Sequence, residues 1–407
     1  MTRIKEIRCI RTRPDGTWVI VKVITDQPGL YGIGSASDYW HSATVIAAIE
    51  EVIAPRLIGR EAGRIEDIWQ STYTRDYWRN GSILNTALAG IDVALWDIKG
   101  KEAGMPVYAL LGGPCRAAVP AYAHAGGSDL LELEEDVRRY MEEGYQYIRC
   151  QLGPYGGGGF IPAEKAGLPK NAWSQAPAFD DEAYLENIPR MFDHLRSKIG
   201  FGPKLTHDVH EHLKPQNAVT LSKLLEPYRL YFLEDALSPE QVAWYRLIRQ
   251  QCTTPQAMGE LFINPHEWTP LIVEQLIDFI RVRVSKGGGI SPCKKLAALC
   301  ESFGVQTAWQ EGGDNDPVNQ MAAVHLDLAC WNFGIQEENH FRPEELEVFP
   351  GHAVLEGGYL YANEQPGLGI DIDEGKAAAM LDGERVVRHK FSGGNEDRRA
   401  DGSVVRP

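Results

Sequence analysis

The sequence predicts an α/β protein in which a TIM-type (β/α) barrel follows an N-terminal α+β capping domain. Short apolar runs, each followed by a helix-length segment, recur eight times after residue 119. From the third run onward a carboxylate follows each of three runs at equal spacing: Asp208, Glu234 and Glu260 are 26 residues apart (208 to 234 and 234 to 260). One strand, one helix and two loops occupy about that length, which is the repeat unit of a (β/α) barrel.

The first part of the chain carries the pattern of a small α+β domain. The β-branched run "WVIVKVITD" predicts a strand, and "ATVIAAIEEVIAPRLIG" has helical periodicity that is expected to end at Pro55 and Gly59. The apolar segment "TALAGIDVALWDIKGKEAG" predicts a buried helix that ends at Gly104. We therefore assign residues 1–114 to the capping domain.

The predicted barrel domain comprises residues 115–375, and residues 376–407 are expected to return to the capping domain. Its eight candidate strands are "VPAYAH", "YQYIRCQ", "PKLTHDVH", "RLYFLED", "PQAMGEL", "FIRVRVS", "VQTAWQE" and "WNFGIQE". A long segment rich in glycine and proline, residues 153–181, interrupts the pattern after the second strand. A loop of that length in a compact domain is usually a lid or a disordered insert.

Composition excludes several classes of function. The formal net charge of −15 and the pI of about 5.3 argue against nucleic acid or an anionic membrane as partner, because both need a basic face. The N-terminus lacks the apolar core of a secretory signal, and no run approaches the ~18 apolar residues that span a bilayer. Seven dispersed cysteines, none in a C-x-x-C pair, indicate reduced thiols in a cytoplasmic protein.

Polar residues that end the barrel strands are the candidates for chemistry, because these ends meet at one mouth. Three carboxylates on successive strands would repel one another unless a cation lay among them, and hard oxygen ligands favour Mg²⁺ over zinc. The polar residues at the strand ends are His124, Arg149, Gln151, Asp208, His210, Glu234, Glu260, Arg281, Gln310 and Glu337.

The three histidines of "THDVHEHL" are predicted to have different roles. H-E-x-x-H, the zinc pattern on a helix, is absent. Asp208 and His210 alternate onto one side of an extended strand, so His210 is expected to face the mouth. His207 and His212 are expected to face away or to cap the next helix.

The motifs "HDVH", "LED" and "GEL" on successive strands resemble the enolase superfamily, whose members include mandelate racemase and muconate lactonizing enzyme. "YWRNG", "ALAGIDVALWDIKGKEAGMPVYALLGG", "YAHAGG", "FGIQE", "LEVFPGH" and "PGLGIDID" extend the resemblance over nearly the whole chain. It is closest to the mannonate dehydratase group of acid-sugar dehydratases, which act on acids such as D-mannonate, D-gluconate and D-galactonate. The resemblance implies the fold predicted above and a homo-oligomer.

Residue by residue, the resemblance implies Mg²⁺ on Asp208, Glu234 and Glu260, with His210 as the general acid for a departing C3 hydroxyl. The base of the family is a tyrosine on the long loop, assisted by an arginine, and Tyr155 and Arg149 fit these places. The remaining positions implied to contact substrate are Tyr39, His124, Glu260, Arg281, Gln310, Asp314 and Glu337. Tyr39 and Gln310 depart from the asparagine and histidine of the family.

The function expected from these residues is Mg²⁺-dependent dehydration of an aldonic acid, with loss of the C2 proton and the C3 hydroxyl, to a 2-keto-3-deoxy acid. An alternative is a protein that binds metal and a sugar acid with weak or no turnover, which Gln310 and Tyr39 favour. Epimerisation or racemisation is less favoured, because Gln310 and the Arg149-Cys150-Gln151 stretch offer no second base. Lys286 fits a loop lysine beside a glycine turn rather than a catalytic lysine.

Overall fold

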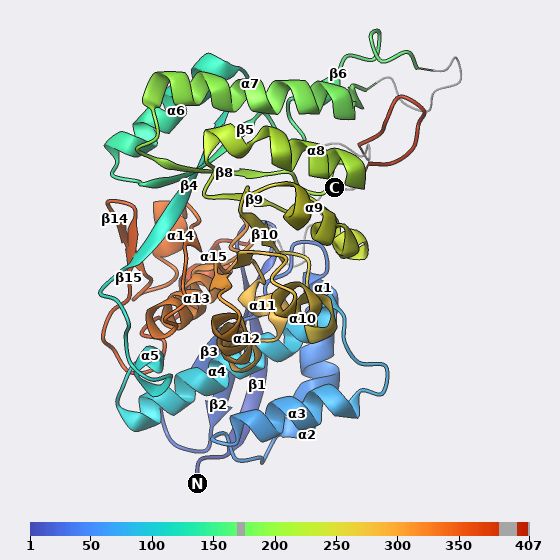
Figure 1. Cartoon of the computed structure of the whole chain (residues 1–407). Helices are drawn as coiled ribbons and strands as arrows, with labels where there is room; N and C mark the ends of the chain where they lie inside the picture. Colours follow the sequence, from blue (N-terminus) through green and yellow to red (C-terminus); the bar gives the residue numbers. More distant parts are fainter. Residues whose placement is uncertain (169–175, 382–396, 406–407) are drawn as a thin grey trace. The chain divides into compact units, whose positions relative to one another are not determined.

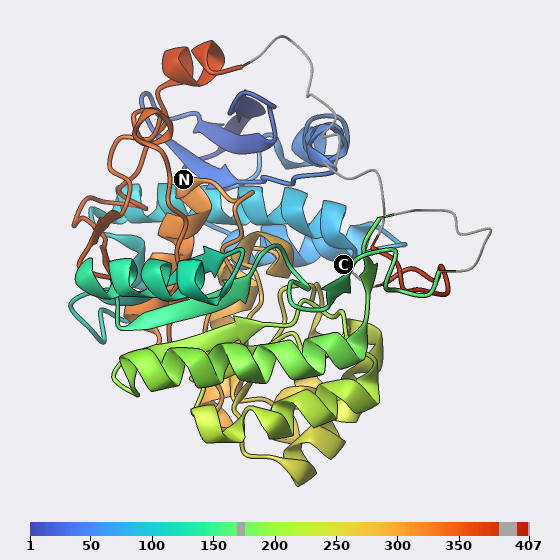
Figure 2. The same ribbon diagram turned by 90° about the horizontal axis from the view of Figure 1, so that it is seen from above.

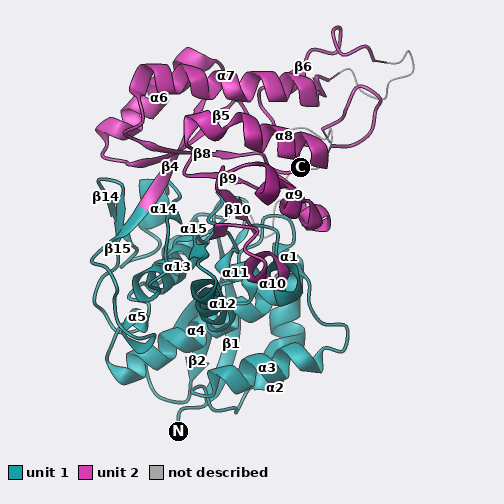
Figure 3. Cartoon of the chain, in the orientation of Figure 1, with its two compact units in different colours: residues 1–120, 260–268, 281–389 teal, residues 121–259, 269–280, 390–407 magenta. Residues whose placement is uncertain are grey.

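The computed structural model describes residues 1–168, 176–381 and 397–405. These residues form two compact units, coloured separately in Figure 3. Unit 1 comprises residues 1–120, 260–268 and 281–389, and unit 2 comprises residues 121–259, 269–280 and 390–407. Within the described part of the chain, no helix combines the length and apolar character needed to cross a membrane.

Unit 1 begins with an antiparallel sheet in the order β1-β2-β3. A long helix, α4, packs on this sheet (Figure 2). The approach is close because β3 carries glycine: a Cβ on Gly34 would lie 2.1 Å from the carbonyl oxygen of Gly90 in α4. The elements are β1 (Ile4–Thr12), β2 (Trp18–Thr25), β3 (Tyr31–Ser35), α3 (Ile65–Arg75), α4 (Ser82–Ala103) and α5 (Val107–Leu110).

The predicted end of α4 is confirmed, whereas the predicted stop at Pro55 is wrong. Gly104 caps α4 in the left-handed conformation, with φ of 65°. The earlier helical segment runs through Pro55 as α1 (Ser42–Ala47), a π-helical stretch η1 (Ala48–Ile53) and α2 (Ala54–Leu57). The wider π-helical turn before Pro55 accommodates a ring that would crowd a regular α-helical turn. The chain turns at Gly59, where φ is 82°.

Unit 2 contains six parallel strands in the order β11-β10-β9-β8-β5-β4. Successive helices pack side by side, α6 against α7, α7 against α8, and α8 against α9 (Figure 1). The strands are β4 (Val119–Gly127), β5 (Tyr147–Leu152), β8 (Lys204–Asp208), β9 (Phe232–Glu234), β10 (Gln256–Met258) and β11 (Phe279–Ile280). The helices are α6 (Leu130–Glu142), α7 (Asp181–Ile199), α8 (Pro215–Leu224), η2 (Glu226–Tyr228), η3 (Pro239–Trp244) and α9 (Tyr245–Gln251). The residues of helix α10 (Pro265–Val273) are divided between unit 1 and unit 2.

The last two predicted barrel strands lie in unit 1, as β12 (Gln306–Thr307) and β13 (Gln336–Glu337). Each of the eight predicted strand segments therefore contains an observed strand, although the last three strands are only two residues long. Unit 1 also contains α11 (Val284–Gly287), α12 (Ile290–Ser302), α13 (Pro317–Ala329), α14 (Pro343–Leu346), β14 (Val354–Glu356), β15 (Tyr359–Tyr361) and α15 (Glu374–Ala379).

The C-terminal segment and the long loop are described in part. Helix α15 packs on β1, and Glu374, which lies just before the predicted returning segment, pairs with Arg8 and Lys22 of the first sheet. Residues 397–405 instead belong to unit 2. In the long loop, β6 (Phe160–Ile161) pairs with β7 (Ala178–Phe179), while residues 169–175 lie outside the described residues, so the prediction of a lid or disordered insert is not tested there.

Replacement of Gly34 by alanine is expected to destabilise the chain by about 1–3 kcal/mol, because the new methyl group would overlap the α4 backbone. Thermal unfolding measures the effect. Gly63→Ala is the control, since a Cβ there meets nothing nearer than the Nζ of Lys99 at 3.8 Å. Equal melting temperatures for the two variants would contradict the close packing of β3 on α4.

Candidate active site

Two of the predicted metal ligands lie side by side in unit 2. Asp208 ends β8 and Glu234 ends β9, and the two residues are register partners in neighbouring parallel strands. Both are buried, with 2% and 1% of their surfaces exposed. Two buried carboxylates at one level of a sheet repel each other, which is the arrangement that a bound cation relieves.

Tyr155, the predicted base, lies beside the predicted arginine. The guanidinium of Arg149 donates a hydrogen bond to the phenol oxygen of Tyr155 over 3.0 Å, and the same nitrogen lies 3.5 Å from Asp208. The ring of Tyr155 stacks on the imidazole of His210 with 4.0 Å between the ring centroids. Unit 2 thus brings the three residues predicted to be catalytic into one contact group next to Asp208.

The position of His210 has a different origin from the one that the sequence suggested. Strand β8 ends at Asp208, so the predicted alternation along an extended strand is wrong. His210 and Glu211 have left-handed backbones, with φ of 52° and 64°. Such conformations are uncommon for residues other than glycine and gather at functional sites. The turn is fixed because the backbone N–H of His210 donates to Asp208 over 2.8 Å.

The other two histidines have structural surroundings, as predicted. The ring nitrogens of His207 lie 2.8 Å from the hydroxyl of Tyr184 and 2.8 Å from the carbonyl oxygen of Cys150. Burial lowers the pKa of His207 to about 4, so this side chain is neutral near pH 7. His212 is buried against the aromatic ring of Phe179 and does not cap α8, which begins after Lys214.

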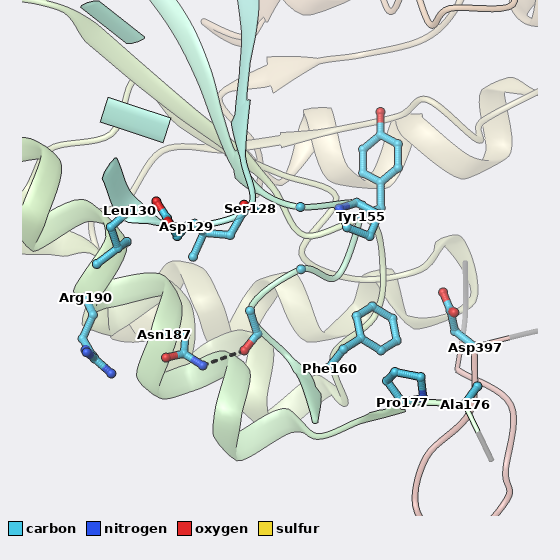
Figure 4. Close-up of a pocket in the computed structure, with 15 residues that line it drawn as sticks. Ser128, Asp129, Leu130, Tyr155, Phe160, Ala176, Pro177, Asn187, Arg190 and Asp397 are labelled. Atoms are coloured by element: carbon cyan, nitrogen blue, oxygen red, sulfur yellow. Dashed lines mark hydrogen bonds between the residues drawn. The ribbon is translucent and has the colours of Figure 1, made fainter. Parts of the chain in front are cut away.

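The loop that carries Tyr155 also borders a cavity of about 640 Å³ within unit 2. Its lining includes Leu130, Phe160 and Asn187, whose side-chain amide donates to the carbonyl oxygen of Gly158. Figure 4 shows the ring of Tyr155 pointing away from this space. The phenol therefore reaches Arg149 and His210 rather than the cavity beneath its own loop.

Two further predicted positions lie in β4 and β5. His124 is the register partner of Arg149 in the neighbouring strand, and its ring stacks on Tyr122. Gln151 lies two residues beyond Arg149, on the same side of β5, and is buried. The alternation of β5 thus places Arg149 and Gln151 on the same face of the sheet.

In unit 1, one guanidinium joins three of the predicted site residues. Arg283 donates to the side-chain oxygen of Gln310 over 2.5 Å and to Asp314 over 2.7 Å, and it lies 3.6 Å from Glu260. Burial alone would lower the pKa of this guanidinium, but the neighbouring anions raise it, so the group stays charged. Sequence reasoning missed Arg283, although its position two residues after Arg281 in "RVRVS" signalled a second inward-facing arginine.

Arg281 and Glu337, both predicted to contact substrate, are bound to each other. Their side chains form an ion pair of 2.6 Å, and Arg281 also donates to the carbonyl oxygen of Ala308. Both are buried. The adjoining Glu311 was also missed: burial raises its pKa well above the usual range, while the positive charge of Arg283 opposes that change.

Lys286 is not the loop lysine that the sequence suggested. It lies in α11 within a buried ion pair with Asp38 and also donates to the hydroxyl of Thr86 over 3.0 Å. Burial lowers the pKa of Lys286, while Asp38 opposes that change. The adjacent Tyr39 packs edge-on against Trp40, and burial with the nearby Asp314 raises its phenol pKa. Tyr39, the capping-domain residue predicted to contact substrate, therefore directly follows Asp38 of the buried Lys286–Asp38 ion pair.

Comparison with known proteins identifies the class. Residues 6–112 match the family "Mandelate racemase / muconate lactonizing enzyme, N-terminal domain", and residues 132–376 match the family "Enolase C-terminal domain-like". The chain is therefore an enolase-superfamily protein, with the N-terminal capping domain and the barrel domain of that fold. The fold class and the superfamily predicted from the sequence are both confirmed.

Relatives define the family within this class. A D-galactonate dehydratase family member from Paenibacillus sp. (strain JDR-2) is 62% identical over the full length of both chains, and one from Pantoea ananatis (strain LMG 20103) is 48% identical over 99% of both. The chain belongs to the D-galactonate dehydratase family. A crystal structure of an enolase from Pantoea ananatis, with bound D-gluconate and Mg, is 49% identical and covers all of both chains with a TM-score of 0.91.

Proposed function

We propose that this chain catalyses the Mg²⁺-dependent dehydration of an aldonic acid, with loss of the C2 proton and the C3 hydroxyl, to a 2-keto-3-deoxy acid. The observation that carries the proposal is the contact group of Arg149, Tyr155 and His210 beside Asp208. The chain is an enzyme of the hydro-lyase class, in keeping with the dehydratase family to which it belongs. The D-gluconate of the Pantoea ananatis structure supports an acid sugar as substrate.

The donor set suits Mg²⁺. Asp208 and Glu234 offer hard carboxylate oxygens at neighbouring strand ends, and Glu260 follows the next strand, β10, by two residues. We assign the three carboxylates as the metal ligands, and the Mg of the Pantoea ananatis structure supports this assignment. When bound, Mg²⁺ polarises the carboxylate of the substrate and so makes the C2 proton more acidic.

The acid and base roles follow from what each side chain can do. Tyr155 accepts the C2 proton as a phenolate, because the Arg149 cation at 3.0 Å stabilises the negative charge on its oxygen. Arg149 itself stays protonated and cannot serve as the base. His210 gives a proton to the departing C3 hydroxyl. The stacked rings of Tyr155 and His210 hold the two proton-transfer groups against each other.

Incubation with Mg²⁺ and a panel of aldonic acids in D₂O tests the proposal. We expect at least one acid to yield a 2-keto-3-deoxy product with deuterium incorporated, and EDTA to abolish the reaction. The panel includes D-gluconate, D-galactonate and D-mannonate. Exchange at C2 without product for every acid would overturn dehydration in favour of epimerisation.

A protein that binds the acid without turnover is the second candidate function. The observation that favours it is Gln310, whose amide cannot transfer a proton and is bound by Arg283. This function predicts that Mg²⁺ and an aldonic acid together raise the melting temperature, with neither product nor C2 exchange. That result would replace the dehydratase proposal.

A further inference from the structure

We propose that Arg283 is a positioning residue that turns Gln310 into a fixed hydrogen-bond donor for a hydroxyl or carboxylate oxygen of the substrate. The inference rests on the proposed function and identifies a residue of unit 1 that recognises the substrate by a hydrogen bond. It concerns Arg283, Gln310, Gly312 and Asp314, which all belong to unit 1. The orientation of the Gln310 amide does not follow from the strand-end pattern of the sequence.

The orientation of the Gln310 amide is chemically determined. A guanidinium has donors and no acceptor, so the Gln310 atom that lies 2.5 Å from the Nε of Arg283 has to be the amide oxygen. The amide nitrogen then faces the other way. Among the described residues this nitrogen donates to no partner. The Gln310 amide nitrogen is not completely buried, so it can still donate to a bound molecule.

Arg283 is itself held on a second side and cannot easily swing away. Its NH1 donates to Asp314 over 2.7 Å, and the positive charge of Arg283 holds the pKa of Asp314 below its usual range although burial opposes this. The guanidinium of Arg283 thus donates hydrogen bonds to Gln310 and to Asp314 at the same time. A planar cation with several fixed donors can hold two partners at once, which a lysine cannot do.

Because Gly312 has no side chain, the side chains of Arg283 and Gln310 can pack against its backbone. A Cβ at Gly312 would lie 2.7 Å from a terminal nitrogen of Arg283 and 2.8 Å from the amide nitrogen of Gln310. The loop cannot shift freely, because the carbonyl oxygen of Gly312 accepts a hydrogen bond from the side chain of Asn339 over 2.9 Å. A Cβ at the next residue, Gly313, would meet nothing within 4 Å among the described residues. The two glycines therefore form a matched pair for mutagenesis.

The consequence for recognition is a donor of fixed direction and no charge. Such a group binds an oxygen lone pair of the substrate, and it neither accepts a hydrogen bond nor supplies a proton. Gln310 therefore selects among aldonic acids by the position of an oxygen. Proton transfer is left to the residues of unit 2.

Calorimetric titration of D-gluconate in the presence of saturating Mg²⁺ tests the inference. Gln310→Glu keeps the oxygen that accepts from Arg283 but replaces the outward donor with an acceptor. We expect its melting temperature to equal or exceed that of the wild type, while D-gluconate binds at least about 10-fold more weakly. Gln310→Met is expected to weaken binding by a similar factor without adding a charge.

Gly312→Ala and Arg283→Lys test the positioning role, and each is expected to raise the dissociation constant for D-gluconate by about 10-fold. Arg283→Lys keeps the positive charge beside Asp314 but removes the planar group that donates to Asp314 and Gln310 at the same time. The double variant Arg283→Lys/Gln310→Met is expected to bind no more weakly than Gln310→Met, because both changes remove one contact. Gly313→Ala is the control and is expected to stay within twofold of the wild type.

Dissociation constants within twofold of the wild type for Gln310→Glu or for Gly312→Ala would overturn the inference. So would additive losses in the double variant. Binding of D-gluconate by the wild type without product from any aldonic acid would instead contradict the proposed function alone. A crystal structure of Arg283→Lys gives a reading that needs no ligand: a turned Gln310 amide supports the positioning role, and an unchanged one overturns it.

Discussion

Replacing Asp208 with Asn is expected to lower the rate of product formation by about 10³-fold or more, because Lewis-acid stabilisation by a metal contributes several kcal/mol. Asp208 is buried beside its register partner Glu234, so the substitution removes one charged oxygen from the proposed metal site. The measurement is the initial rate of 2-keto-3-deoxy acid formation at several Mg²⁺ concentrations. The exposed Asp67→Asn is the control with the same chemical change.

The same substitution makes a second, opposite prediction for stability. Without metal, Asp208 and Glu234 repel each other, and Asn relieves this repulsion, so the melting temperature in EDTA is expected to stay equal or rise. Mg²⁺ at 100 times its dissociation constant stabilises a binding protein by about 2.7 kcal/mol, and Asp208→Asn should lose this increment. A variant that unfolds at lower temperature in EDTA yet retains the Mg²⁺ increment would contradict the assignment of Asp208 as a metal ligand.

Replacing Tyr155 with Phe is expected to reduce both product formation and C2 exchange by about 10² to 10⁴-fold, the usual contribution of a general base. The substitution removes one oxygen, and the ring can still stack on His210. Binding of the acid sugar should change little, so the loss should appear in kcat rather than in KM. Steady-state rates in D₂O measure both quantities.

Tyr361→Phe is the matched control for Tyr155→Phe, because the two tyrosines are 41% and 40% exposed. Arg149→Lys adds a second test, since lysine keeps a positive charge but not the planar geometry that joins Tyr155 to Asp208. We expect the rates of product formation and C2 exchange in Arg149→Lys to lie between those of the wild type and those of Tyr155→Phe. Full exchange at C2 in Tyr155→Phe would exclude this phenol as the base.

The fold followed from patterns that depend on local chemistry. Eight apolar runs located the eight strands because a buried strand needs a short continuous run of apolar residues. The capped end of α4 followed from Gly104, which adopts the left-handed backbone as expected. The path through Pro55 could not be predicted, because a π-helical stretch has no distinct sequence signal. The assignment of residues 115–375 to one domain stays a prediction.

The positions of site residues could be predicted where the residue ends a strand. They could not be predicted where the backbone of a turn determines the direction of the side chain. Asp208 and Glu234 lie at strand ends as expected, whereas His210 depends on a left-handed turn that no periodicity shows. The ion pairs of Arg283 with Asp314 and of Lys286 with Asp38 were not predicted, because the partners are distant in sequence. Ion pairs of that kind depend on tertiary packing. The assignment to a homo-oligomer also stays a prediction.

The most direct test of the central claim is the separation of the two proton transfers in His210→Asn. With Mg²⁺ and an aldonic acid that the wild type dehydrates, product formation and C2 exchange are measured together in D₂O. If Tyr155 is the base and His210 the acid, product formation falls by about 10² to 10⁴-fold while C2 exchange persists. Undiminished product formation by His210→Asn, or loss of exchange in a correctly folded variant, would contradict the assignment.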